Sequence, residues 1–366
     1  MGFKCGIVGL PNVGKSTLFN ALTATAAAEA ANYPFCTIEP NIGRVGVPAK
    51  RLDDLASIAG SGKIIPTQLE FVDIAGLVRG ASRGEGLGNK FLGHIREVDA
   101  IVHVVRCFEN SDITHVEGEI DPLRDIDVIE TELMLADMES LEKRLPAFEK
   151  KVRIKDPQAL LHFPLMERAL DLLKEGKPAR FVQCSFEEKA ALQHLQLITT
   201  KPILYVCNVA EDDVSRGNHF TKLVKARADQ EGSRMAITSA AIEADVASLD
   251  SEEEKREFLQ SLGLDETGLT RVIREGYALL NLITFFTIGP KEAHAWTVEQ
   301  GAKAPQAAGT IHTDFERGFI CAETSSFEDY IAFQGEQGVK AAGKLRLEGR
   351  DYLVQDGDIF HFRFNV

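Results

Sequence analysis

The feature that most constrains the fold of this 366-residue chain is a short run near its N-terminus. Residues 9–16 read GLPNVGKS and fit the P-loop pattern G-x-x-x-x-G-K-[ST] at every position. An apolar run at residues 3–8 precedes them and a helical pattern at residues 15–25 follows. A chance match in a glycine-containing turn would not explain this context. The run predicts a P-loop NTPase, with Lys15 on the β- and γ-phosphates and Ser16 on Mg²⁺.

A second part of the phosphate site is expected at residues 73–76, which read DIAG and end a buried apolar run. Asp73 would hold Mg²⁺ through a water molecule, and the Gly76 N–H would meet the γ-phosphate. The D-x-x-G pattern occurs in many turns, so its weight comes from its position after a P-loop and at the end of a strand.

Two loops are candidates for switches. Thr37 lies in residues 32–40 and could close onto Mg²⁺ when the γ-phosphate is present, although an ordinary surface threonine is an equal alternative. Residues 79–88 contain four glycines, which favours a mobile second switch beside the γ-phosphate. A plain flexible loop would have the same composition.

The base site is expected where guanine-binding proteins carry N-K-x-D. Residues 208–211 read NVAE, so the lysine is absent and the aspartate is replaced by a longer acid. Adenine has an unprotonated N1 and no 2-amino group, so it offers this carboxylate no donor. Instead, the Asn208 side chain and the Val209 main-chain carbonyl could accept from the adenine N6 amine. We therefore expect adenine rather than guanine, held by Asn208, Val209, Glu211, Ser239 and Ala240.

The order of apolar patterns predicts an α/β protein with an inserted helical segment. Over residues 1–125, strand-like runs alternate with helical stretches, which indicates a parallel sheet covered by helices. From Ile126 the apolar residues recur at steps of three and four, so we expect an antiparallel helical hairpin over residues 126–201. Strand patterns then return, and the sheet domain resumes over residues 202–280. Residues 281–366 have the short aromatic and β-branched runs of a small mixed α+β module.

Composition excludes several classes of protein. The net charge of −14 does not support wholesale coating of nucleic acid. No run approaches the ~20 apolar residues of a membrane span, and the N-terminus does not have the pattern of a signal peptide. The six cysteines contain no C-x-x-C pair, which favours reduced thiols over a zinc site. We expect a cytoplasmic protein without membrane contact, and a monomer.

One local basic cluster departs from the acidic balance. Six basic residues and a single acid, Glu149, stand within residues 143–155, close to the expected tip of the hairpin. They could contact ribosomal RNA, although a solvated helix face is an equal alternative. The basic residues are Lys143, Arg144, Lys150, Lys151, Arg153 and Lys155.

Taken together, these motifs resemble the Obg-like translational GTPase group, and specifically its YchF subfamily of Obg-like ATPases. The match runs over nearly the whole chain. The residues that carry it are 9–16, 33–37, 73–78, the N-x-x-E at 208–211, and residues 303–309 and 311–314.

The resemblance implies a Ras-like G domain that is interrupted by a coiled-coil insertion and followed by a TGS domain, a ubiquitin-like β-grasp. It also implies a preference for ATP and association with ribosomes. Ser16 and Thr37 would ligate Mg²⁺, and Val209 would contact the base through its main chain. The phosphate loop would consist of Asn12, Val13, Gly14, Lys15, Ser16 and Thr17.

Intrinsic hydrolysis is expected to be slow. Many related enzymes place Gln directly after D-x-x-G to orient the attacking water, but here the residue is Leu77. His115 lies on a loop after the fourth strand and could reach the site if that loop folds over it; the resemblance points the same way, and an exposed or structural histidine is the alternative. Asn12 could coordinate K⁺ beside the phosphates, in place of an arginine finger.

The function expected from the sequence is a regulatory ATPase whose nucleotide state governs its association with ribosomes. Two alternatives remain open. One is a GTPase switch of the same fold, which nucleotide affinities would distinguish. The other is a binding module that uses ATP only to set its conformation, with negligible catalysis.

Overall fold

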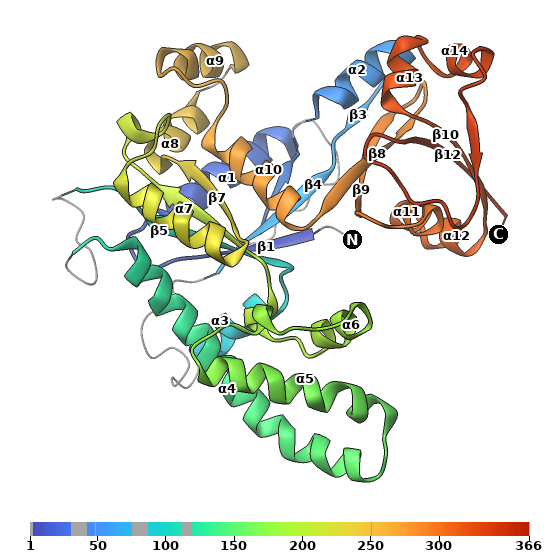
Figure 1. Cartoon of the computed structure of the whole chain (residues 1–366). Helices are drawn as coiled ribbons and strands as arrows, with labels where there is room; N and C mark the ends of the chain where they lie inside the picture. The colour runs from blue at the N-terminus through green and yellow to red at the C-terminus, as the bar shows by residue number, and fades with distance from the viewer. Residues whose placement is uncertain are drawn as a thin grey trace. The chain divides into compact units, whose positions relative to one another are not determined.

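The computed structural model describes residues 3–30, 42–47, 49–74, 87–110, 119–249 and 251–365. The chain divides into two compact units, coloured along the sequence in Figure 1. One unit contains Phe3–Gly43 and Glu70–Leu279, and the other contains Arg44–Leu69 with the residues from Leu280 onward. In the described part of the chain, the helices are all too short or too polar to cross a membrane.

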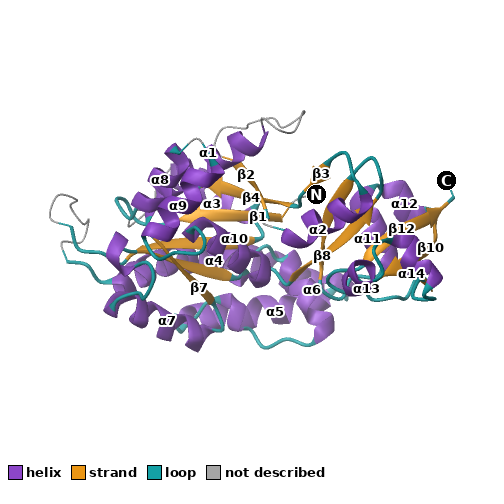
Figure 2. Ribbon diagram, turned by 90° about the horizontal axis from the view of Figure 1, so that it is seen from above, coloured by secondary structure: helices purple, strands orange, loops and turns teal. Residues whose placement is uncertain are grey.

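The larger unit is built on a six-stranded sheet, in which β1, β5, β6 and β7 run parallel. Every residue of β5 is buried, as expected for a central parallel strand with both faces covered. Figure 2 shows the strands between α1 and α8 on one side and α7 on the other. In spatial order the strands are β2 (Ile42–Gly46), β4 (Gln68–Asp73), β1 (Phe3–Val8), β5 (Ala100–Arg106), β6 (Ile203–Asn208) and β7 (Arg234–Thr238).

The helices of this unit follow the strands along the chain, as the alternating pattern predicted. Helix α10 packs against β5, β6 and β7, and α7 packs against β6 and β7. The helices are α1 (Lys15–Ala30), α3 (Leu87–Arg96), α7 (His219–Glu231), α8 (Ala240–Ser248), α9 (Glu252–Ser261) and α10 (Gly268–Leu279).

The inserted segment is an antiparallel helical pair, α4 (Pro122–Arg153) and α5 (Pro157–Lys174), followed by the short α6 (Phe186–His194) (Figure 1). Both long helices begin with an aspartate N-cap and a proline in the first turn; Asp121 accepts from the N–H groups of residues 123 and 124. The expectation of a long helix followed by a second one is confirmed.

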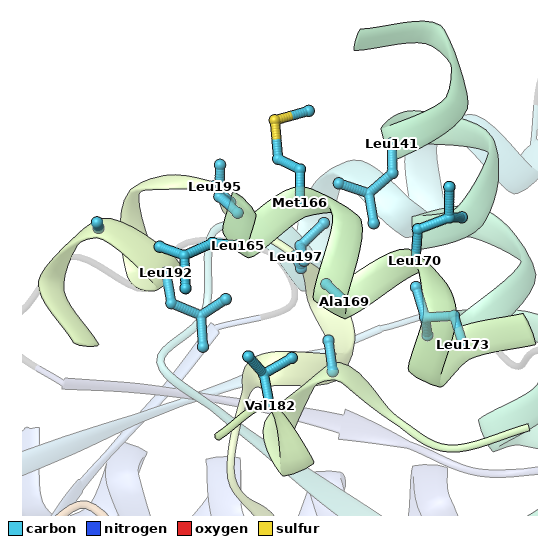
Figure 3. Close-up of a cluster of buried hydrophobic side chains, with 12 residues drawn as sticks. Leu141, Leu165, Met166, Ala169, Leu170, Leu173, Val182, Leu192, Leu195 and Leu197 are labelled. Atoms are coloured by element: carbon cyan, nitrogen blue, oxygen red, sulfur yellow. The ribbon is translucent and has the colours of Figure 1, made fainter. Parts of the chain in front are cut away.

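A compact apolar cluster holds this insertion together. Figure 3 shows Leu141 of α4 next to Leu170 of α5, and Leu165 of α5 on the side of Leu192 of α6. Burying a leucine side chain contributes about 1.5–3 kcal/mol, so the cluster stabilises the helical pair.

Buried ion pairs join the insertion to the sheet. Arg180 contacts both Glu130 of α4 and Glu231 of α7, and Arg227 contacts the same two acids. The Tyr205 hydroxyl on β6 donates to Glu231 at 2.9 Å. Each charge is paired, and removing one partner of such a cluster leaves an uncompensated buried charge, which typically costs about 3–5 kcal/mol.

The smaller unit has its own mixed sheet, with β8 antiparallel to β9, β10 antiparallel to β12, and β12 parallel to β8. One face is covered by α2 (Lys50–Ala59) and α13 (Phe327–Ala332), and the other by α11 (Ala304–Ile311). In spatial order the strands are β11 (Arg346–Glu348), β10 (Phe319–Ser325), β12 (Ile359–Phe364), β8 (Leu282–Ile288), β9 (Ala293–Glu299) and β3 (Ile64–Ile65).

The smaller unit includes a segment that the sequence analysis assigned to the sheet domain, Arg44–Leu69. Leu52 and Leu55 of α2 are buried in one cluster with Phe286 and Ile359, and β3 pairs with β9. The sequence pattern had predicted this segment within the sheet domain of residues 1–125, because the pattern of an amphipathic helix shows that a face is buried but not which sheet buries it.

Candidate nucleotide-binding site

The loop between β1 and α1 has the backbone shape that a phosphate loop needs. Asn12 and Gly14 have positive φ angles, of 63° and 93°. A Cβ on Gly14 would lie 2.2 Å from Asn208 Nδ2, and one on Gly9 would lie 2.8 Å from the Val104 carbonyl oxygen. Both glycines are therefore required by close approach of other chain segments, and Gly14 also by its conformation.

The side chains expected at the phosphates and the metal meet at one edge of the sheet. Lys15 forms an ion pair with Asp73, and the two side chains are only 10% and 21% exposed. This follows from the strand order, because β4 and β1 are neighbours and their carboxyl ends lie side by side. Ser16 is exposed in the first turn of α1.

The oxygen groups at this edge of the sheet are suitable ligands for Mg²⁺. The Ser16 hydroxyl and the Asp73 carboxylate are hard oxygen ligands, and Mg²⁺ is commonly bound through one or two such groups together with substrate phosphates. The described residues contain no cluster of three or more His, Cys, Asp or Glu side chains that could hold a metal by themselves. Thr37, Gly76 and His115, which were expected at the metal and the γ-phosphate, lie outside the described residues.

Asn208 has partners within the protein that the sequence analysis did not predict. Its side chain is 4% exposed; Nδ2 donates to the Val13 carbonyl and Oδ1 accepts from the Ala240 N–H, both at 2.9 Å. These internal bonds make the amide a structural tie, and because Oδ1 has a second lone pair, its contact with an adenine amine stays a prediction. Asn208 joins the phosphate loop to the loop that follows β7.

The other residues expected at the base lie at the ends of β6 and β7. The Val209 N–H donates to the Thr238 carbonyl at 2.9 Å, which ties the two strand ends together. Ser239 and Ala240 are buried at the start of α8, whereas Glu211 is exposed. The Val209 main chain and the Ser239–Ala240 turn are therefore placed on one edge with the P-loop.

Two supporting residues were not predicted from the sequence. Asn218 donates through Nδ2 to the Cys107 carbonyl and to Asp213, both at 2.8 Å, and so ties together the loops after β5 and β6. Its sequence signal was an asparagine three residues before Thr221, a capping box for α7. Arg106, 1% exposed at the end of β5, donates to two carbonyls of the loop that follows it.

The two histidines near the sheet differ in environment. His94 is exposed on α3. His103, in the middle of β5, is 3% exposed and faces the Tyr205 ring. Burial lowers the pKa of His103 to about 4, against the opposing charge of Glu231, so the imidazole is neutral at physiological pH.

Three side chains of the basic cluster on the hairpin have polar partners within the protein, and two of these, Lys143 and Arg153, are still 73% and 72% exposed. Lys143 pairs with Glu139, Arg153 pairs with Glu149, and Arg144 donates to the Leu195 carbonyl. The remaining basic residues lie around Ile154, whose side chain is 78% exposed at the turn between α4 and α5. They are the exposed Lys150, Lys151 and Lys155.

Curated relatives match this chain from end to end. The "Ribosome-binding ATPase YchF" of Haemophilus influenzae is 59% identical over 366 residues, which is all of both chains. The proteins of the same name from Escherichia coli O157:H7 and Bacillus subtilis are 57% and 52% identical, again with complete coverage of both chains.

Family models and a solved structure agree with these matches. A model described as "50S ribosome-binding GTPase" matches residues 4–137, and the YchF-GTPase C-terminal model, described as a protein of unknown function, matches residues 282–365. A solved structure described as that of the Schizosaccharomyces pombe YchF GTPase has a TM-score of 0.88 and 38% identity. It covers 99% of this chain, and this chain covers 98% of it.

Proposed function

Because the chain belongs to the YchF family, we propose that it hydrolyses ATP at its P-loop and binds the ribosome under the control of the bound nucleotide. The observation that carries the proposal is the convergence of three segments on one sheet edge. Lys15 and Asp73 meet there, and Asn208 ties the phosphate loop to the turn at Ala240. We further propose that the protein acts in the cytoplasm as a monomer.

The residues at this edge have separate tasks in hydrolysis. Lys15 holds the β- and γ-phosphates, and the main-chain N–H groups of the P-loop surround them. Ser16, Thr37 and, through water, Asp73 would hold Mg²⁺, which neutralises the charge that develops between the β- and γ-phosphates. The Gly76 N–H would meet the γ-phosphate.

The attacking water needs help that Leu77 cannot give, because its side chain has no hydrogen-bonding group. We assign this role to His115, and single-turnover hydrolysis by His115→Ala at the wild-type rate would refute the assignment. The exposed Asn12 lies on the P-loop, where it could coordinate K⁺ beside the phosphates. Equal hydrolysis rates in K⁺ and Na⁺ buffers would refute that role.

The base is proposed to be adenine. The Val209 main-chain carbonyl accepts from the N6 amine, and Glu211 finds no N1–H or 2-amino donor on adenine. The names of the relatives differ on this point, since the bacterial proteins are called ATPases and the S. pombe protein a GTPase. A site whose polar groups are left unpaired by the wrong base can discriminate against that base by up to several orders of magnitude.

Titration of the full chain with Mg-ATP and Mg-GTP tests the choice of base. We expect ATP to bind at least about tenfold more tightly, which corresponds to about 1.4 kcal/mol. Tighter binding of GTP would establish a GTPase switch instead. ATP turnover measured with and without ribosomes then separates an ATPase from a module that uses ATP only to set its conformation.

The surface proposed to contact ribosomal RNA is the turn between α4 and α5. Lys150, Lys151 and Lys155 are exposed there, with Lys151 over the Phe148 ring. Lys143 and Arg153 are also exposed but form ion pairs one helical turn away, and Arg144 donates to the Leu195 carbonyl. An exposed cluster of positive charge in a chain of net charge −14 is the electrostatic signature of a local phosphate contact. We therefore assign the main contribution to RNA binding to Lys150, Lys151 and Lys155, and a smaller contribution to Lys143, Arg144 and Arg153.

A further inference from the structure

Glu243 is a buried carboxylate that takes no part in the phosphate, metal or base contacts. It lies in the first turn of α8, three residues after Ala240, and is 2% exposed. Its Oε1 accepts a hydrogen bond of 2.7 Å from the N–H of Gly268, the first residue of α10. The Thr238 hydroxyl at the end of β7 donates to the same oxygen at 3.4 Å.

The junction around this carboxylate leaves no room for adjustment. A Cβ on Gly268 would lie 2.3 Å from Thr238 Oγ1 and 2.9 Å from Glu243 Oε1. Thr238 itself is 1% exposed. The start of α10 therefore packs against the end of β7, and the Glu243 carboxylate accepts a hydrogen bond from each of them.

The same junction holds the turn that is proposed to contact the base. The Thr238 carbonyl accepts from Val209, and the Glu243 N–H donates to the Ser239 carbonyl at 3.0 Å. On the other side, Ala240 donates to Asn208. The turn is thus fixed from two directions, by Asn208 toward the phosphate loop and by Glu243 toward α10.

We propose that Glu243 is a positioning residue for the nucleotide base: it fixes the turn at residues 238–240 against the start of α10, so that affinity for the base depends on a carboxylate that never touches the nucleotide. The inference rests on the proposed adenine site at Val209, Ser239 and Ala240. Removal of the carboxylate releases the turn, whereas the P-loop keeps its own shape through Gly14 and its tie to Asn208.

The test compares a nucleotide with a ligand that has no base. We expect Glu243→Ala to weaken Mg-ATP binding by about tenfold or more, because small displacements of a binding group cost that much or more. Mg-tripolyphosphate engages only the phosphate loop, so its affinity should change by less than about twofold. Burial raises the pKa of the Glu243 carboxyl, against the hydrogen bonds from Gly268, Leu269 and Thr238 that lower it. Glu243→Gln keeps an oxygen acceptor and should bind ATP within about threefold of wild type.

Asp137 provides a matched control. It is 1% exposed on α4 and accepts from the N–H groups of Ile198 and Thr199, at 2.9 and 2.8 Å, but it lies in the insertion and has no bond to the base-side turn. Asp137→Ala should lower the melting temperature, as Glu243→Ala does, without changing ATP affinity. Equal loss of ATP binding in both variants would overturn the proposal.

Further outcomes separate this inference from the proposed function. A folded Glu243→Ala protein that binds ATP like wild type, or that loses ATP and tripolyphosphate to the same extent, refutes the positioning role. If Glu243→Ala does not fold, Gly268→Ala decides, because its methyl group would press on both Thr238 and the Glu243 carboxylate and so disturb the same junction. Weakened ATP binding supports the role, and unchanged binding overturns it. Failure of the wild-type chain to bind ATP would refute the proposed function instead.

Discussion

Gly14 shows how a single residue fixes the shape of the phosphate loop. Its φ of 93° is a conformation that other residues reach only with strain, and its missing side chain leaves space for Asn208 Nδ2. The P-loop pattern identified the glycine, but not its contact, since Asn208 lies far away in the sequence. The motif thus predicts which residues form the loop, and tertiary packing decides which residues hold it.

Replacing this glycine should abolish tight nucleotide binding. In Gly14→Ala the new methyl group meets the Asn208 amide, so we expect the Kd for Mg-ATP to rise at least about tenfold. Gly60→Ala is a suitable control, because Gly60 also has a positive φ, of 64°, and an added methyl group would meet no atom within 4 Å. The control should lose about 1–2 kcal/mol of stability and keep its affinity. Equal affinities in the two variants would show that the loop does not depend on Gly14 in this way.

His103 predicts a pH dependence of stability. Its folded-state pKa is about 4 and the ordinary value is 6.5, so between these values the unfolded chain binds a proton that the folded chain does not. Its contribution to stability is therefore complete above pH 6.5 and is lost as the pH falls toward 4, by about 2 kcal/mol at pH 5. Urea unfolding at pH 7.5 and pH 5 measures the loss.

The control for this prediction is His103→Phe, which cannot titrate. The difference in unfolding free energy between the two pH values should be smaller in the variant than in wild type by about the same 2 kcal/mol. An identical pH dependence in both proteins would show that His103 is not buried as a neutral imidazole.

Among the elements, the inserted helical pair was the part most readily predicted. The apolar stripe from Ile126 gave the helix, but α4 begins four residues earlier, at Pro122. The sequence signal for this start is the N-cap Asp121 followed by Pro122, and the spacing of apolar residues does not reveal it. Helix α2 shows the opposite case, since no helix was predicted over residues 50–59 and its packing against Phe286 depends on residues more than two hundred positions away.

The exposed turn between α4 and α5 leads to a prediction at this scale. Replacing Lys150, Lys151 and Lys155 with Glu should weaken co-sedimentation with ribosomes by about tenfold or more at moderate salt, because each lost phosphate contact also removes salt-dependent counterion release. The control is Lys143→Glu, because Lys143 is already paired with Glu139. Wild-type binding by the triple variant, at low and high salt, would refute the RNA contact.

At the scale of the whole molecule, the fold class could be predicted because strand and helix patterns alternate and a P-loop fixes their order. The sequence predicts a base site at the ends of β6 and β7, but it did not predict that Asn208 ties the phosphate loop to the turn at Ala240, because Val13 and Ala240 are distant from Asn208 in sequence. Glu243 gave no sequence signal beyond that of an acidic residue in the first turn of a helix. Long-range hydrogen bonds are the part of this site that periodicity and motifs do not predict.

The central claim is that a metal-bound triphosphate is held at the edge where Lys15 meets Asp73. Calorimetric titration of wild type and Lys15→Ala with Mg-ATP tests it most directly. We predict that the variant stays folded and loses at least about tenfold in affinity, since the lysine is a main source of positive charge for the β- and γ-phosphates. Undiminished ATP binding by Lys15→Ala would contradict the claim.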